Sequence, residues 1–151
     1  MQTTDSFSKA IILGATGGIG RHLATELAKH LDFLVLVGQN PDKLSQLQKE
    51  LAGSKAQLSI KVLNLCDKEA LENFGKVLDA DLLVNCTGLA SFSIGSDLAT
   101  EKEQELWQVN YHTPVQLMKL LVQKKSENPT SPTFLTSSSF SPSLFSGIQC
   151  Q

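Results

Sequence analysis

The sequence predicts one doubly wound α/β domain, in which a parallel sheet lies between two layers of helices. Three observations predict it. Strand-like and helix-like segments alternate five times, a glycine-rich turn follows the first strand-like segment, and 151 residues suit a single domain. Such alternation requires parallel strands joined by right-handed crossovers. With 41% hydrophobic and 19% charged residues, the chain is neither disordered nor a coiled coil.

Five short apolar segments are expected to form the strands. The run 10–13 stops at a glycine, and the run 33–37 is rich in aliphatic and β-branched residues, so both suit strands that are buried on two faces. The segment 57–65 alternates in its first half and predicts a third strand. The fourth and fifth strands are expected at 81–84 and 133–137.

Four helices with apolar residues three or four positions apart are expected between these strands. The first begins at Ile19. Asn40 is a good N-cap and Pro41 suits the first helical position, so a second helix begins there. Asp67 caps the third, and the fourth runs from Glu101 to about Lys125. The positions that give each helix one apolar side are Leu23, Leu27, Leu31, Leu44, Leu47, Leu51, Leu71, Phe74, Leu78, Leu106, Val109, Thr113, Leu117, Leu120 and Leu121, of which Leu44, Leu47 and Leu51 are expected to be buried.

The C-terminal segment differs in composition from the rest of the chain. No charged residue occurs in 128–151, and 141–147 lacks the amphipathic helix expected after a fifth strand. We therefore expect a domain that is incomplete at its C-terminus and exposes apolar surface on one flank. The expected contributors are Leu117, Leu120, Leu121, Phe140 and Phe145. Such a surface favours association, which leaves a homo-oligomer open.

Charge and composition exclude several classes of partner. The net charge of −2 lacks the basic excess of a nucleic-acid binder. No apolar run approaches the roughly 18 residues of a membrane helix, and the polar N-terminus does not resemble a signal peptide. We therefore expect a cytoplasmic protein with no membrane partner. Three scattered cysteines and three histidines without ligand spacing predict neither disulfide nor metal site.

The strongest local signal is the glycine-rich turn at 14–20, between the first strand and the first helix. Glycine lets the backbone approach a pyrophosphate and lets the helix lie close to the strand, while the first N–H groups of the helix point at the phosphates. The spacing alone is weak, but its strand–turn–helix context strengthens it. A glycine turn without a ligand is the alternative. The expected contacts are Gly14, Thr16, Gly17, Gly18, Ile19 and Gly20.

With these glycines and three later marks, the sequence resembles the short-chain dehydrogenase/reductase family. The marks are Asn64-Leu65 at the end of the third strand, Asn85-Cys86-Thr87-Gly88 after the fourth, and Asn110 in the long helix. The resemblance covers residues 9 to about 139, although Leu13 stands where the family has threonine. It implies a Rossmann fold, cofactor contacts from the first two marks, and hydride transfer between a nicotinamide dinucleotide and a small carbonyl or alcohol substrate.

The position of Asn110 before a proline also allows an interpretation that does not depend on the family resemblance. Pro114 lies four residues later and has no N–H, so the carbonyl of Asn110 cannot make its usual helical hydrogen bond and is open to water. In the family that it resembles, this carbonyl holds a water of the proton relay. A proline kink that serves packing alone remains equally open.

The choice of cofactor depends on the end of the second strand. An acidic residue there would bind the ribose 2′-OH of NAD, and an arginine would accept the 2′-phosphate of NADP. The chain has Gly38-Gln39-Asn40, which argues against strict NAD use. The family resemblance leans towards NADP, although Gln39 brings no charge. Alternatively, Gln39 and Asn40 serve only to cap the next helix.

The resemblance further implies a serine after the fifth strand and a Tyr-x-x-x-Lys about 13 positions beyond it. Ser138 and Ser139 are the candidates, and counting favours Ser139. The only tyrosine is Tyr111, which lies in another helix, so we expect this chain to be inactive by itself. Three hypotheses follow: a short-chain oxidoreductase whose chain is incomplete, a dinucleotide-binding module without chemistry, and a SAM-dependent methyltransferase. The marks at 85–88 and Asn110 argue against the third.

Overall fold

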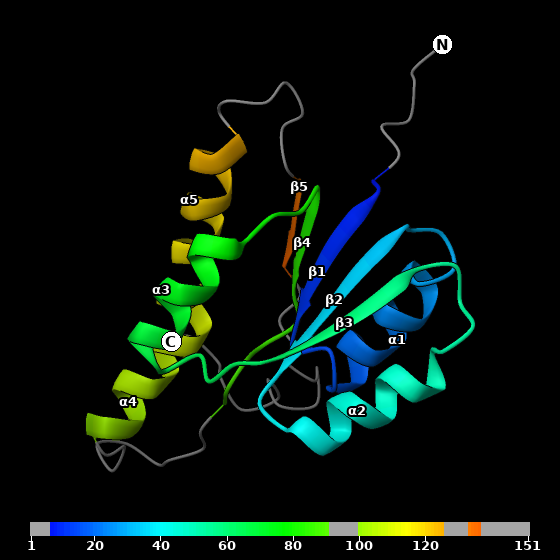
Figure 1. The fold of residues 1–151 in the computed structure, drawn as a ribbon. Helices are drawn as coiled ribbons and strands as arrows, with labels where there is room; N and C mark the ends of the chain where they lie inside the picture. The colour runs from blue at the N-terminus through cyan, green and yellow to red at the C-terminus, as the bar shows by residue number, and fades with distance from the viewer. Residues whose placement is uncertain (1–6, 91–99, 126–132, 137–151) are drawn as a thin grey trace, which may run out of the picture.

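A five-stranded parallel sheet forms the centre of the protein in the computed structural model, which describes residues 7–90, 100–125 and 133–136 (Figure 1). The strand order is β3-β2-β1-β4-β5, and every neighbouring pair is parallel. The strands are β1 (Lys9–Leu13), β2 (Phe33–Gly38), β3 (Gln57–Val62), β4 (Leu82–Asn85) and β5 (Thr133–Thr136). The predicted doubly wound Rossmann fold is therefore confirmed, with β1 at its centre.

Helices cover both faces of this sheet. Figure 1 shows α1 and α2 on one face, and α3, α4 and α5 on the other. The second and third helices begin where the sequence predicts, because Asn40 Oδ1 accepts from the N–H of Lys43 at 2.9 Å and Asp67 Oδ1 accepts from that of Ala70 at 3.0 Å. The helices are α1 (Gly18–Leu27), α2 (Pro41–Glu50), α3 (Lys68–Val77), α4 (Thr100–Trp107) and α5 (Thr113–Lys125).

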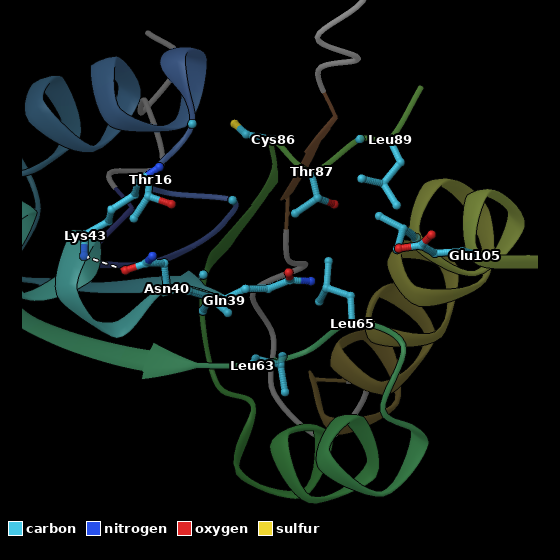
Figure 2. Close-up of a pocket in the computed structure, with 16 residues that line it drawn as sticks. Thr16, Gln39, Asn40, Lys43, Leu63, Leu65, Cys86, Thr87, Leu89 and Glu105 are labelled. Carbon is cyan, nitrogen blue, oxygen red and sulfur yellow. Dashed lines mark hydrogen bonds between the residues drawn. The ribbon is translucent and has the colours of Figure 1, made fainter. Parts of the chain in front are cut away.

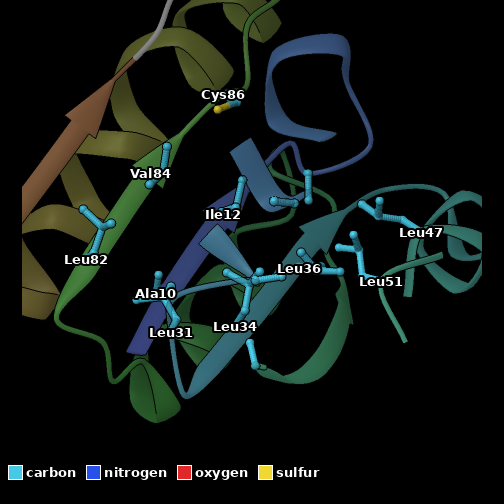
Figure 3. Packing of buried hydrophobic residues seen from close by; sticks show 14 of the residues in the cluster. Ala10, Ile12, Leu31, Leu34, Leu36, Leu47, Leu51, Leu82, Val84 and Cys86 are labelled. Carbon is cyan, nitrogen blue, oxygen red and sulfur yellow. The ribbon is translucent and has the colours of Figure 1, made fainter. Parts of the chain in front are cut away.

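The core has two layers because successive side chains of each strand point to opposite faces of the sheet. Ala10 and Ile12 of β1 pack in the layer below α1 and α2, which Figure 3 shows from close by. Ile11 and Leu13 belong to the opposite layer. That second layer is completed from the helical side by Leu71, Phe74, Leu78, Val109, Leu117 and Leu121.

Two predicted elements differ from the structure. The helix expected over 101–125 is interrupted by a π-helical turn, η1 (Gln108–His112), in which the N–H of Thr113 donates to the carbonyl of Gln108. Pro114 supplies no N–H to the carbonyl of Asn110, so regular α-helical bonding cannot run through this point. Separately, β3 ends at Val62 and not at residue 65, although Leu63 and Leu65 are still buried in the loop that follows.

The expectation of an exposed flank is wrong for the residues named from α5. Leu117 and Leu121 are completely buried against α3, and Leu120 contacts Gly75 so closely that a Cβ there would lie 2.5 Å from Leu120 Cδ1. Phe140 and Phe145 lie outside the described residues. The large apolar side chains that are exposed along α4, η1 and α5 are Trp107, Tyr111, Met118 and Val122.

The described helices are short. None of them is long and apolar enough to cross a membrane. The longest, α5, has 13 residues, whereas a transmembrane helix needs about 20 apolar ones. Within the same three stretches of chain, no group of three or more His, Cys, Asp or Glu side chains gathers in a way that could hold a metal ion.

The buried position of Leu117 gives a first prediction. Leu117→Ala should lower the free energy of unfolding by about 2–5 kcal/mol, because it leaves a cavity between α5 and α3. Val122→Ala, on the exposed side of the same helix, should change it by less than about 0.5 kcal/mol. Urea unfolding measures both variants. Equal losses for the two would show that Leu117 is not buried against α3 as described.

Candidate functional site

A cavity of about 340 Å³ opens at the carboxyl ends of the strands (Figure 2). It lies where the chain crosses from β3, at one edge of the sheet, to β4 on the other side of β1. Open α/β sheets bind ligands at this kind of switch point. The lining residues are Gly14, Thr16, Gly17, Val37, Gly38, Gln39, Asn40, Lys43, Leu63, Leu65, Cys86, Thr87, Gly88, Leu89, Glu105 and Val109.

Two glycines of the turn are required by the fold itself. Gly14 has a φ of +74°, and a Cβ there would lie 2.9 Å from the carbonyl carbon of Cys86. A Cβ on Gly20 would lie 2.1 Å from the carbonyl oxygen of Gly14. The N–H groups of Gly14 and Ala15 both donate to the carbonyl of Val37, at 2.9 and 3.0 Å. The turn is therefore held to β2 and β4, and these two positions accept no larger residue whether or not a ligand binds.

Gly18 is different, because a Cβ there would have no atom within 4 Å. It is the first residue of α1, whose N-cap is Gly17, and no side-chain hydrogen bond caps the helix. By contrast, α2 and α3 are capped by Asn40 and Asp67. The first turn of α1 also holds no acidic residue. An uncapped helix start beside open space fits a phosphate, since its N–H groups and the helix dipole both favour an anion.

The loop after β3 supplies an apolar wall. The N–H of Leu63 donates to the carbonyl of Gly38 at 2.9 Å, and Leu63, Leu65 and Val109 are all buried. Thr113 holds this loop from the helix side: its side chain is completely buried, and its Oγ1 donates to the carbonyl of Leu65 at 2.9 Å. The wall can contact a planar apolar group.

Asn64 lies beside this wall but does not line the cavity. Its Oδ1 accepts from the N–H of Cys66 at 3.0 Å, and both residues line a neighbouring hollow at the start of α4. Burial, followed by the nearby Glu105 carboxylate, raises the pKa of the Cys66 thiol. Cys66 is therefore a neutral thiol near pH 7.

The end of β4 is fixed by Asn85. Its Oδ1 accepts from the N–H of Thr87 at 3.2 Å and from the hydroxyl of Thr87 at 2.6 Å. The N–H of Cys86 donates to the carbonyl of Leu13 at 2.9 Å. Asn85 thus shapes the turn, while Cys86, Thr87 and Gly88 reach the cavity.

Asn110 braces the following loop. Its Nδ2 donates to the carbonyl of Leu89 at 2.9 Å, and its Oδ1 accepts from the N–H of Leu89 at 2.8 Å. The side chain thereby ties η1 to the loop that follows β4. The neighbouring Tyr111 is exposed and meets the ring of Trp107 edge-on, with centroids 5.9 Å apart.

The structure brings most of the predicted cofactor contacts together. Predicted residues that line the cavity are Gly14, Thr16, Gly17, Gln39, Asn40, Leu65, Cys86, Thr87 and Gly88. Predicted residues that do not line it are Gly18, Ile19, Gly20, Asn64 and Asn85. Ser138 and Ser139 lie outside the described residues.

Sequence reasoning missed several lining residues, of which Lys43 and Leu89 matter most. Lys43 lies three positions after the correctly predicted N-cap Asn40, so its place in the first turn of α2 was already a signal. Leu89 directly follows Gly88. The others are Val37, Gly38, Leu63, Glu105 and Val109.

Comparison with known proteins identifies the family. The family described as short chain dehydrogenase matches residues 8–138. Dehydrogenase/reductase SDR family member 7B of Mus musculus is 32% identical over 124 residues, which are 74% of this chain and 38% of that protein. The 3-ketodihydrosphingosine reductase of Bos taurus is 32% identical over 116 residues, 67% of this chain and 33% of its own. The chain belongs to the short-chain dehydrogenase family.

Solved structures agree with this. L-sorbose reductase from Gluconobacter frateurii, complexed with NADPH and L-sorbose, has a TM-score of 0.71 at 27% identity, covering 78% of this chain and 47% of that one. The bulky-bulky ketone specific alcohol dehydrogenase from Comamonas testosteroni has a TM-score of 0.80 at 18% identity, covering 87% of this chain and 54% of that one. At this low identity the similarity supports the fold alone. The chain thus spans less than two fifths of these curated relatives and about half of these structures.

The brace by Asn110 gives a second prediction. Asn110→Ala should speed hydrogen exchange at the amide of Leu89 and lower stability by about 1 kcal/mol, because it removes both bonds to that residue. Asn73→Ala, which removes an exposed amide bonded to Lys76, is the matched control and should leave this exchange unchanged. Unaltered protection of Leu89 in Asn110→Ala would refute the brace.

Proposed function

We propose that this chain binds a nicotinamide dinucleotide in the cavity at the carboxyl edge of its sheet. The observation that carries the proposal is the uncapped start of α1 beside the open space at Gly18, which faces a switch point of a parallel sheet. The pyrophosphate lies at the first N–H groups of α1. The adenine lies against Leu63, Leu65 and Val109, the apolar wall of the cavity.

The protein to which this sequence belongs is proposed to transfer hydride between the dinucleotide and a carbonyl or alcohol substrate. Family membership and the names of the relatives, which include reductases of ketone compounds, support this activity. When bound, the nicotinamide would supply the hydride to a carbonyl or accept it from an alcohol. The residues of this chain hold the dinucleotide, and Asn110 positions the loop at Leu89 beside it.

NADPH is proposed to bind more tightly than NADH. No acidic residue stands at Gly38, Gln39 or Asn40, where a carboxylate would repel a 2′-phosphate and bind the ribose 2′-OH of NADH. A similar structure, L-sorbose reductase, was solved with NADPH, which agrees with this preference.

A dinucleotide-binding module without chemistry is the second candidate. The reduction of a ketone needs a proton donor beside the reacting oxygen, and a phenol with a reference pKa of about 10 needs a neighbouring lysine to act near neutral pH. The one tyrosine of the 151 residues, Tyr111, is followed at the fourth position by Val115. This sequence therefore contains no Tyr-x-x-x-Lys.

A third prediction concerns binding. Calorimetric titration of the 151-residue chain should show NADPH binding more tightly than NADH, and Gly18→Val should abolish both, because its side chain fills the space for the phosphate. The variant should still fold, since a Cβ at Gly18 meets no atom. Thr25→Val, farther along α1, is the control and should bind normally. No binding of either nucleotide would refute the proposal, and tighter binding of NADH would refute the preference.

A fourth prediction concerns turnover. The 151-residue chain should not oxidise NADPH in the presence of ketones or aldehydes, because it lacks the Tyr-x-x-x-Lys proton donor. Loss of NADPH absorbance measures this directly. Turnover by the wild-type chain that is abolished in Gly18→Val would contradict the prediction and exclude the module without chemistry.

A further inference from the structure

The cavity carries an unbalanced positive charge at one end. Among the described lining residues, the charged side chains are Lys43 and Glu105, which Figure 2 shows at opposite sides. Glu105 is neutralised by Lys102, with Nζ and Oε2 2.7 Å apart. No carboxylate of the described residues forms an ion pair with Lys43. Asp42 precedes it in α2 but does not line the cavity.

Lys43 is aimed at the glycine turn. Its backbone is fixed, since its N–H donates to Asn40 Oδ1 at 2.9 Å. Figure 2 shows its side chain extending towards Thr16. The hydroxyl of Thr16 in turn lies beside the end of β2, because a Cβ on Gly38 would lie 3.4 Å from Thr16 Oγ1. The cation of Lys43 and the hydroxyl of Thr16 therefore line the same part of the cavity, between the glycine turn and the end of β2.

Gln39 points elsewhere. Figure 2 shows its side chain extending across the cavity towards Leu65, away from Lys43. The neutral residue at the position that normally decides between the two cofactors is thus directed at the apolar wall. Of these two side chains, that of Lys43 extends towards Thr16.

We propose that Lys43, together with the hydroxyl of Thr16, receives the 2′-phosphate of NADPH and is the residue that sets the cofactor preference of this chain. The inference rests on the proposed function, because it places the adenosine ribose between the glycine turn and the end of β2. An ammonium donates charge-assisted hydrogen bonds to a phosphate, which NADH lacks at this position. Because Lys43 is exposed, its contribution weakens as salt rises.

The test compares the affinities of NADPH and NADH for three variants. Lys43→Gln should lower the affinity for NADPH about tenfold and leave the affinity for NADH unchanged, since only NADPH carries the 2′-phosphate. Lys43→Arg should retain the preference. Lys49→Gln removes an equal charge from the last turn of α2, outside the cavity, and should leave both affinities as in the wild type. Thermal unfolding verifies that each variant is folded.

The outcomes separate this inference from the proposed function. Loss of preference in Lys43→Gln at low salt, with NADH affinity intact, supports it. If Lys43→Gln binds both nucleotides with the same ratio of affinities as the wild type, this inference is overturned, but the proposal of dinucleotide binding is not. If Lys49→Gln loses as much affinity for NADPH as Lys43→Gln, the inference is also overturned, because the effect would then come from the net charge of the protein. If the wild-type chain binds neither nucleotide, both proposals fall.

Discussion

The close approach of α1 to the end of β1 determines the geometry of the rest of the site. The backbone at Gly20 lies so near the carbonyl of Gly14 that only a hydrogen fits between them. The same turn is bonded to Val37 and lies against Cys86, so the carboxyl ends of β2 and β4 converge on it. The start of α1 is thereby held next to the cavity with its N–H groups unoccupied by any side chain. Backbone packing alone thus produces the uncapped helix start that the proposed phosphate site requires.

The opposite wall of the cavity is held by the irregular stretch of helix around η1. Asn110 is bonded to Leu89 and Thr113 to Leu65, so one helix fixes the loops after both β4 and β3. Because Pro114 interrupts the α-helical bonding here, the π turn brings both side chains to the sheet edge. A site whose walls are fixed before the ligand arrives loses less entropy on binding, which favours affinity.

Much of the fold and of the candidate site could be predicted from the sequence, because the patterns that indicate them are local. Strand runs, the caps Asn40 and Asp67, and the glycine turn each reflect a few neighbouring residues. The burial of Leu117 could not be predicted in this way, because periodicity shows that a helix has an apolar face but not that α3 covers it. Lys43 was missed for a similar reason: a long side chain on a polar surface shows its direction only once the glycine turn is placed beside it.

The central claim is that a dinucleotide lies across the carboxyl edge of the sheet, with its phosphates at the start of α1. The most direct measurement is a map of backbone amide chemical shifts of the isotope-labelled chain during titration with NADPH. The account predicts the largest changes at Gly17, Gly18 and Ile19, with further changes at the walls around Leu65 and Leu89. Changes confined to the groove between α3 and α5, or none at saturating NADPH, would contradict it.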